Sequence, residues 1–144
     1  MSEINEKDDI KIFPDQGITY AQGFLASGLN CGIRVARKDL ALLYSEKIAS
    51  AAAVYTQNSF KAAPLCVTAK NMALSGGKIQ AILINSGIAN ACTGEKGVED
   101  AWETVGYVAQ ALKISADNVA VTSTGKIGEF LPLEKIKGGV KRAA

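Results

Sequence analysis

Histidine is absent from this sequence of 144 residues. Its absence excludes Ser-His-Asp and Cys-His catalysis, metal sites with histidine ligands and the commonest general base of enzymes. If the chain takes part in acyl transfer, the base must therefore be another kind of group or come from elsewhere.

Long apolar segments and a strong net charge are also missing. No apolar run approaches the roughly 20 residues that span a bilayer, and the polar start MSEINEKDDIK is neither a signal peptide nor an Arg-rich transit peptide. The net charge of +2 is too small to indicate nucleic acid or an anionic membrane as a partner. We therefore expect a cytoplasmic protein that binds neither of them.

Cysteine is scarce and shows no metal-binding spacing. Cys31, Cys66 and Cys92 lie far apart, and no two of them form a C-x-x-C pair. A zinc knuckle or a thioredoxin-type site is therefore not indicated, and we expect neither a metal nor a bound cofactor. We predict buried, reduced thiols, and we keep Cys92 open as a functional residue because it lies in a polar loop.

The composition that remains is that of a globular protein, with 48% hydrophobic and 21% charged residues. Residues 1–16 are expected to form a polar N-terminal arm. Residues 17–144 are expected to form one domain, because their number is sufficient to bury a substantial core.

Short apolar segments bounded by Gly, Asn and Ser predict a series of strands. These strands are predicted at residues 23–34, 39–46, 51–58, 79–87 and 118–125. The segment 63–74 begins like a strand after Pro64 and turns helical before Ser75. The continuous apolar run Ala81–Ile84 has the length of a strand that is buried on both faces.

Helical periodicity appears directly after the polar segment at residues 85–94. Apolar residues recur every three or four positions between residues 95 and 113, which predicts an amphipathic helix. The segment 131–144 resembles the start of another helix. Strands mixed with at least one long helix indicate an α/β fold in which helices pack on sheets.

Two polar loops, residues 85–94 and 122–128, follow predicted strands, and such loops commonly carry binding groups. The first leads into the predicted helix, whose free N–H groups could hold an anion. The alternative, which we favour from the sequence, is a turn in which Thr93 or a neighbour caps the helix.

The second loop contains three hydroxyl residues followed by a glycine. A hydroxyl side chain next to the backbone N–H of Gly125 is the donor pair that an oxyanion hole requires. The alternative is a tight turn whose hydroxyls satisfy one another. Lys126 could stabilise an anion or could simply be solvated.

Segments from Gly17 to the C-terminus closely resemble the α-subunit of the bifunctional glutamate/ornithine N-acetyltransferase family of arginine biosynthesis. The resemblance is carried by GITYAQGFLASGLNCGI, KDLALLYSE, AAAVYTQNSFKAAPL, ILINSGIANACTGEKGVEDA and VTSTGKIGEFLPLEKI. The most specific part is NSG-x-ANACTG, followed by E-D-A and later by STG-x-IG.

The resemblance implies a helix–sheet–sheet–helix sandwich of the ornithine acetyltransferase and DmpA-like type. Enzymes of this family cleave themselves into two chains, and the new N-terminal Thr of the second chain is the nucleophile. Acetyl passes from N-acetylornithine to this Thr and then to glutamate by a ping-pong route, and some members also accept acetyl-CoA. The expected partner is a β-subunit chain in an α₂β₂ assembly. A nucleophile that uses its own α-amine as base needs no histidine.

Carried over by position, the oxyanion hole of the family falls on Thr124 and Gly125. Many relatives have Asn at the position of Ile88 and a small apolar residue at that of Lys126, which leaves both donors in place but puts substrate preference in doubt. Family members continue beyond the position of Ala144 with the segment that contains the nucleophile. We therefore expect a truncated chain that cannot carry the chemistry alone.

Two other functions remain open from the sequence. One is an amide or peptide hydrolase subunit of similar fold, in which the acyl group passes to water. The other is a non-catalytic anion-binding domain that uses the loop before Glu95. The NSG-x-ANACTG motif favours the transferase.

Overall fold

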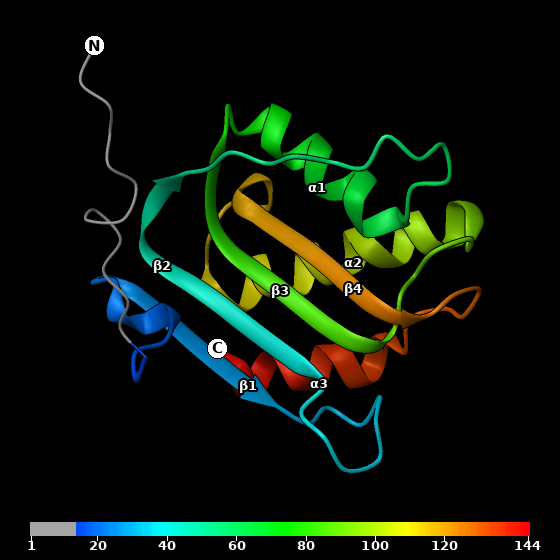
Figure 1. The fold of residues 1–144 in the computed structure, drawn as a ribbon, viewed down its shortest axis with the longest axis horizontal. Coiled ribbons are helices and arrows are strands. Elements are labelled where there is room, and N and C mark those ends of the chain that lie inside the picture. The colour runs from blue at the N-terminus through cyan, green and yellow to red at the C-terminus, as the bar shows by residue number, and fades with distance from the viewer. Residues whose placement is uncertain (1–13) are drawn as a thin grey trace.

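A computed structural model describes residues 14–144 (Figure 1). Most of the expected polar arm at residues 1–16 therefore lies outside the described residues. In chain order, the elements are η1 (Ile18–Tyr20), β1 (Phe24–Leu29), β2 (Leu40–Ser50), α1 (Ala63–Leu74), β3 (Lys78–Ile88), α2 (Gly94–Leu112), η2 (Ala116–Asn118), β4 (Val119–Lys126) and α3 (Leu133–Ala143).

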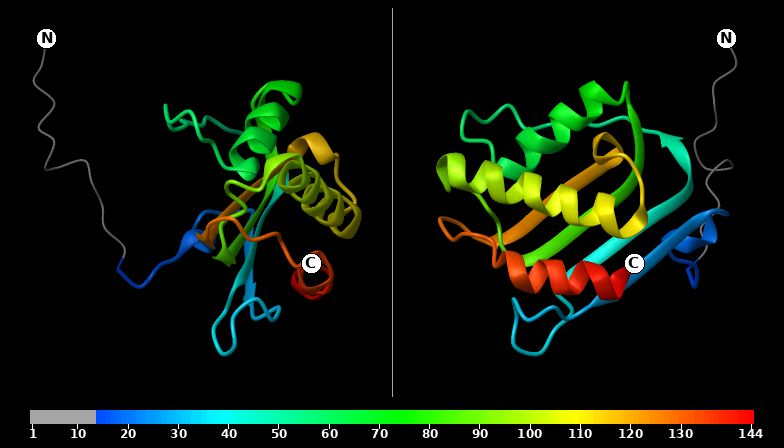
Figure 2. Two further views of the ribbon diagram at one scale, coloured as in Figure 1. Left: turned by 90° about the vertical axis from the view of Figure 1, so that its right-hand side faces the viewer. Right: turned by 180° about the vertical axis from the view of Figure 1, so that it is seen from behind.

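The strands form one sheet in the order β1-β2-β3-β4. The pairs β1–β2 and β2–β3 are antiparallel, whereas β3 and β4 are parallel and are connected through α2. Figure 2 shows α2 and α3 on one side of the sheet and α1 alongside β4. Among residues 14–144, no helix covers the opposite face of the sheet, which faces the viewer in Figure 1.

The hydrophobic core lies between the sheet and the helices. The buried side chains that share this space include Leu40, Leu42, Val67, Ala81, Leu83, Val105, Val108, Val119, Val121, Ile136 and Val140. The run Ala81–Ile84 is buried on one face only, because Leu83 is 3% exposed whereas Ile84 is 38% exposed. Our prediction of a strand buried on both faces is therefore wrong for the described residues, since the helices pack on one side of it.

Most predicted elements are confirmed, and three segments differ from the prediction for physical reasons. Residues 51–58 form no strand; they directly follow β2, whose two sides are already paired with β1 and β3. Residues 63–74 are helical from their start. Pro64 lies in the first turn of α1, where the missing N–H of proline costs no helical hydrogen bond. Residues 30–34, predicted to continue the first strand, instead belong to a loop.

That loop, residues 30–38, is held by the buried side chain of Asp39. The carboxylate accepts hydrogen bonds from the N–H groups of Cys31 at 2.6 Å and Arg34 at 2.7 Å. Burial alone would raise the pKa of Asp39, but these backbone donors outweigh burial and lower the pKa below its usual value of 3.8. The stability that the carboxylate contributes is therefore present above the unfolded-state pKa and is lost as the pH falls through the folded-state value.

The outer edge of β4 is covered by polar side chains of α1. The Thr68 hydroxyl donates to the carbonyl of Val121 at 2.8 Å and accepts from its N–H at 2.9 Å. Asn71 is fully buried, and its side-chain amide donates to the carbonyls of Ala116 and Val119. These contacts satisfy backbone groups that an edge strand otherwise leaves without partners.

Replacing Thr68 by Val tests this arrangement, because valine keeps the shape and removes the hydroxyl. We expect Thr68→Val to lower the free energy of unfolding by about 1–3 kcal/mol, since the N–H and the carbonyl of Val121 both lose their partner. Thr68→Ser, which keeps the hydroxyl, is the matched control. Urea denaturation measures both, and equal losses in the two variants would contradict the role of the hydrogen bonds.

Candidate functional site at the carboxyl ends of β3 and β4

The two sequence segments that we singled out lie side by side at one end of the sheet. In the parallel register, Ser86 pairs with Thr124 and Gly87 pairs with Gly125. Both segments are strands at these positions, with β3 continuing to Ile88 and β4 to Lys126, so the predicted loops begin later than we expected. In α/β sheets, ligands bind beyond the carboxyl ends of parallel strands, which makes this end the candidate site.

The hydroxyl groups of the predicted oxyanion segment differ in their surroundings. The Ser123 hydroxyl donates to Asn85 Oδ1 at 2.6 Å, and the Asn85 side-chain amide donates to the Ile88 carbonyl at 3.0 Å. Asn85 is 4% exposed and thus fixes the two strand ends from inside. Thr122 and Thr124 are exposed, and within residues 14–144 their hydroxyls have no hydrogen-bond partner. The alternative of a turn with self-satisfied hydroxyls is therefore wrong for Thr124.

Thr124 faces away from the helices. Side chains alternate along a strand, and the buried Val119 and Val121 point toward the helical layer. Thr122 and Thr124, at the intervening positions, therefore point to the face of the sheet that no described helix covers. The hydroxyl of Thr124 is available to a group that approaches from that face.

Gly125 and Gly87 make a close contact between the two strands. A Cβ added to Gly125, which has a φ of +135°, would lie 2.2 Å from the carbonyl carbon of Gly87 and 2.6 Å from the nitrogen of Ile88. No side chain fits there, because the obstacles are backbone atoms. The sequence showed both glycines, but we assigned no role to Gly87; a glycine within a strand is the signal that marks such an approach.

The backbone direction of β4 places the Gly125 amide at the outer edge of the sheet. The Lys126 carbonyl points toward β3, where it accepts from the Ala89 N–H at 2.8 Å, whereas the Val119 and Val121 carbonyls point outward to α1. Outward and inward positions alternate along a strand, so Ser123 and Gly125 continue the outward series. At this corner of the sheet, the outward backbone of Gly125 and the free hydroxyl of Thr124 are neighbours.

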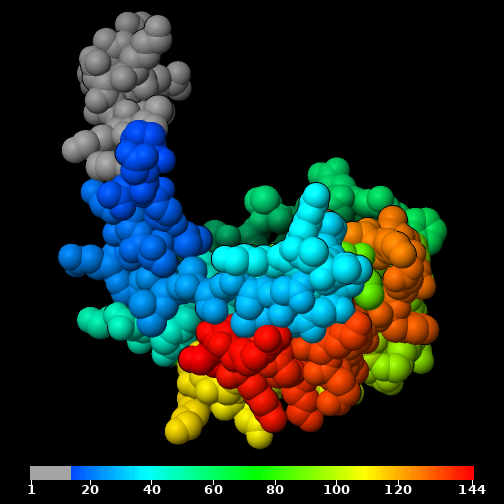
Figure 3. Space-filling model, turned by 90° about the horizontal axis from the view of Figure 1, so that it is seen from below, coloured from blue at the N-terminus to red at the C-terminus, as the bar shows by residue number. Residues whose placement is uncertain are grey.

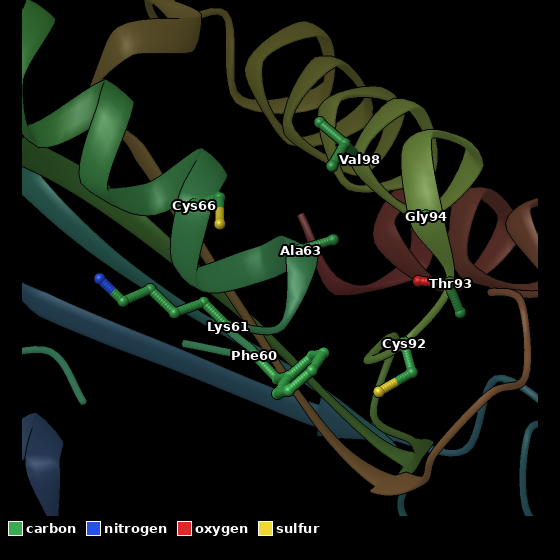
Figure 4. Close-up of a pocket in the computed structure, with 8 residues that line it drawn as sticks. All are labelled: Phe60, Lys61, Ala63, Cys66, Cys92, Thr93, Gly94 and Val98. Atoms are coloured by element: carbon green, nitrogen blue, oxygen red, sulfur yellow. The ribbon is translucent and has the colours of Figure 1, made fainter. Parts of the chain in front are cut away.

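A cavity of about 140 Å³ lies beside this corner, between the N-termini of α1 and α2 (Figure 4). Its lining includes Phe60 and Lys61 before α1 and Cys66 within it, together with Cys92 and Gly94 at the start of α2. The Ala63 N–H donates to the Asn90 carbonyl at 3.2 Å, which joins the two walls. The cavity is small and mainly apolar, and the Lys61 side chain extends away from it (Figure 4).

Thr93 is the N-cap residue of α2, but its hydroxyl does not bond to the helix. It donates instead to the Asn90 side-chain oxygen at 2.8 Å, while the Asn90 side-chain amide donates to the Gly97 carbonyl at 2.8 Å. Our prediction of a capping side chain at Thr93 is therefore wrong, because the fully buried Asn90 takes up the hydroxyl. Within this turn, Asn90 itself has a left-handed backbone conformation with a φ of 49°.

The three cysteines are not all buried, so that part of our prediction is wrong. Cys31 is buried, and burial, with a hydrogen bond to Asp39, raises the pKa of its thiol from 9.0 to about 11. Cys66 and Cys92 are exposed because both border the cavity. All three are free thiols.

Lys126 forms an exposed ion pair with Glu129 at 3.3 Å, so a carboxylate lies beside its positive charge. Ile88 is half-buried and packs against the core.

In the described part of the chain, no three Cys, Asp or Glu side chains are grouped so as to hold a metal ion. Within residues 14–144, no helix has both the length and the apolar character that a membrane crossing requires.

Comparisons with known proteins agree on one family. The family model described as the ArgJ family matches residues 25–144. The arginine biosynthesis bifunctional protein ArgJ of Staphylococcus aureus (strain COL) is 48% identical over 137 residues, which are 95% of this chain and 33% of the relative. The chain thus spans about a third of the length of the curated relatives it matches.

Two crystal structures have folds similar to that of this chain. The ArgJ protein of Bacillus halodurans has a TM-score of 0.86 at 48% identity, covering 88% of this chain and 66% of that chain. The ornithine acetyltransferase of Mycobacterium tuberculosis, solved with ornithine, has a TM-score of 0.85 at 40% identity, covering 91% of this chain and 70% of that chain. These likenesses confirm the predicted α/β fold of the ornithine acetyltransferase type, and the chain belongs to the ArgJ family.

Proposed function

We propose that this chain is the oxyanion-hole part of an acetyltransferase of arginine biosynthesis. The complete enzyme would consist of this chain and a second chain whose N-terminal Thr is the nucleophile. Acetyl would pass from N-acetylornithine to that Thr and then to glutamate, by a ping-pong mechanism. Support comes from the family match and from the names of the relatives, which refer to arginine biosynthesis and to ornithine acetyl transfer.

One observation carries the assignment of the site. The Thr124 hydroxyl has no hydrogen-bond partner among the described residues, and the adjacent Gly125 has no room for a side chain. The Thr124 hydroxyl and the Gly125 N–H would donate to the carbonyl oxygen of the acetyl group as that oxygen becomes negative. Donors that are fixed before the reaction stabilise this charge without reorganisation, and each is worth about 3 kcal/mol of the barrier.

The proposed reaction balances without a cofactor. The α-amine of the N-terminal Thr accepts the hydroxyl proton as the oxygen attacks the acetyl carbon, and the ornithine amine leaves with that proton. The glutamate amine then attacks the acetyl ester, and the Thr oxygen regains a proton. Both half-reactions pass through a tetrahedral oxyanion at the same carbon. This explains how a chain without histidine can serve acyl transfer.

We further propose that the second chain packs on the uncovered face of the sheet, to which Thr124 points, and that the assembly is an α₂β₂ heterotetramer produced by autocatalytic cleavage. Acetyl-CoA would be a second acetyl donor for glutamate, and transfer from it is measured separately.

Mass spectrometry of the complete enzyme tests the central claim. Incubation with N-acetylornithine should add one acetyl group to the N-terminal Thr, and an enzyme that hydrolyses the acetyl group without passing it to glutamate would instead be an amidase of similar fold.

Thr124→Ala tests the oxyanion hole in the complete enzyme. We expect kcat for acetyl transfer to fall by roughly 10²–10³-fold, because one donor to the oxyanion is removed. Thr122→Ala is the matched control, since Thr122 is also exposed and lies two positions earlier on the same face. Thr124→Ser should keep most of the activity. Steady-state rates of Thr124→Ala within a factor of two of wild type would contradict the assignment.

Cys92→Ser tests whether a thiol takes part. We expect acetyl-enzyme formation at the wild-type rate, because the proposed nucleophile is a Thr on the second chain and Cys92 only borders the cavity. Cys66→Ser, on the opposite wall, is the control. Rapid quenching and mass spectrometry measure the acetylated fraction, and loss of acetylation in folded Cys92→Ser protein would make this thiol a catalytic group.

A further inference from the structure

Gly87 stands between Gly125 and a side chain of the loop at residues 30–38. A Cβ on Gly87, which has a φ of +114°, would lie 2.6 Å from Ile33 Cγ2 and 3.4 Å from Arg34 Cγ. On the other side, the carbonyl carbon of Gly87 leaves no room for any side chain on Gly125. Ile33, Gly87 and Gly125 therefore form a stack of three residues from three separate segments. We call it the glycine stack.

The loop that supplies Ile33 is fixed at both sides of that residue. Asp39 accepts from the N–H groups of Cys31 and Arg34, and the Asn30 side-chain amide donates to the Arg34 carbonyl at 2.8 Å. The Asp39 carbonyl also accepts from the N–H of Ser86 at 2.8 Å, directly before Gly87. The loop and the end of β3 are thus joined by hydrogen bonds as well as by packing. Figure 3 shows the loop and the end of β4 at the same end of the molecule.

We propose that Gly87 and Ile33 are positioning residues for the oxyanion donor at Gly125. Ile33 supports Gly87 from behind, and the backbone of Gly87 sets how far Gly125 can move toward β3. This proposal rests on the function proposed above and adds to it the group that holds the donor in place. Neither residue touches the substrate.

The proposal predicts a kinetic pattern that loss of stability alone does not produce. An oxyanion hole acts by preorganisation on charge that exists only in the transition state. A displaced Gly125 N–H therefore lowers kcat and leaves KM for N-acetylornithine nearly unchanged. Acetylation and deacetylation of the enzyme should slow by similar factors, because both half-reactions use the same donor.

Gly87→Ala in the complete enzyme is the main test. We expect kcat to fall about 10- to 100-fold, because a misplacement of about an ångström can cost about 100-fold, while KM stays within a factor of two. Gly76→Ala is the matched control. Gly76 also has a positive φ of +62°, but a Cβ there meets nothing within 4 Å, and it lies before the other end of β3. It should lower the melting temperature and keep kcat.

A double substitution tests the steric cause. Ile33→Ala removes the Cγ2 that a Cβ on Gly87 would meet, so Gly87→Ala combined with Ile33→Ala should recover part of the lost kcat. Recovery remains partial because the positive φ still strains alanine. Ile33→Ala alone creates no overlap and should lower kcat by several-fold, since Gly87 loses its support. This variant decides the question if Gly87→Ala does not fold.

The outcomes separate this inference from the proposed function. If the wild-type complete enzyme transfers no acetyl group, or Thr124→Ala equals wild type, the proposed function fails. If Thr124→Ala is impaired but Gly87→Ala and Ile33→Ala keep kcat within a factor of two, only the positioning role is overturned. A fall in kcat that Gly76→Ala matches at equal melting temperature would also overturn it.

Discussion

The close approach of β3 and β4 at Gly87 and Gly125 is the constraint on which the candidate site depends. The parallel pairing of these strands continues past the two glycines to Ile88 and Lys126. The backbones come so near that a single added carbon at Gly125 would overlap with Gly87. The backbone of β3 therefore limits the positions that the Gly125 backbone can take.

The layers around the sheet separate stability from chemistry. Apolar side chains of β2, β3 and β4 pack against α2 and α3 on one face, and polar side chains of α1 bond to the outer edge of β4. The other face carries Thr122 and Thr124 and is covered by no helix of residues 14–144. In the proposed enzyme, this is the face that a second chain with the nucleophile would meet. Thr124 thus lies on the opposite face of β4 from the apolar side chains that hold the fold.

Buried polar side chains join segments that are distant in the sequence at the same end of the sheet. The Asp39 carboxylate holds the loop 30–38 while its backbone carbonyl accepts from the Ser86 N–H, Asn85 connects β3 to Ser123, and Asn90 orders the turn before α2. Each of these side chains is less than 5% exposed. A buried polar group with its partners in place has few alternative arrangements. This network gives the candidate site a well-ordered base.

The sequence by itself determined the α/β class, the long amphipathic helix and most strands, and the resemblance supplied the proposal that Thr124 and Gly125 form the donor pair. Period and composition are local properties, so the sequence contains them directly. The tertiary structure alone decided that residues 51–58 stay outside the sheet, that Cys66 and Cys92 stay exposed, and that Gly87 lies against Gly125. These outcomes depend on which segments are neighbours in space. The sequence NSG does not show whether its glycine lies in a turn or in a contact between strands. Only the pairing register of β3 with β4 shows that Gly87 lies in such a contact.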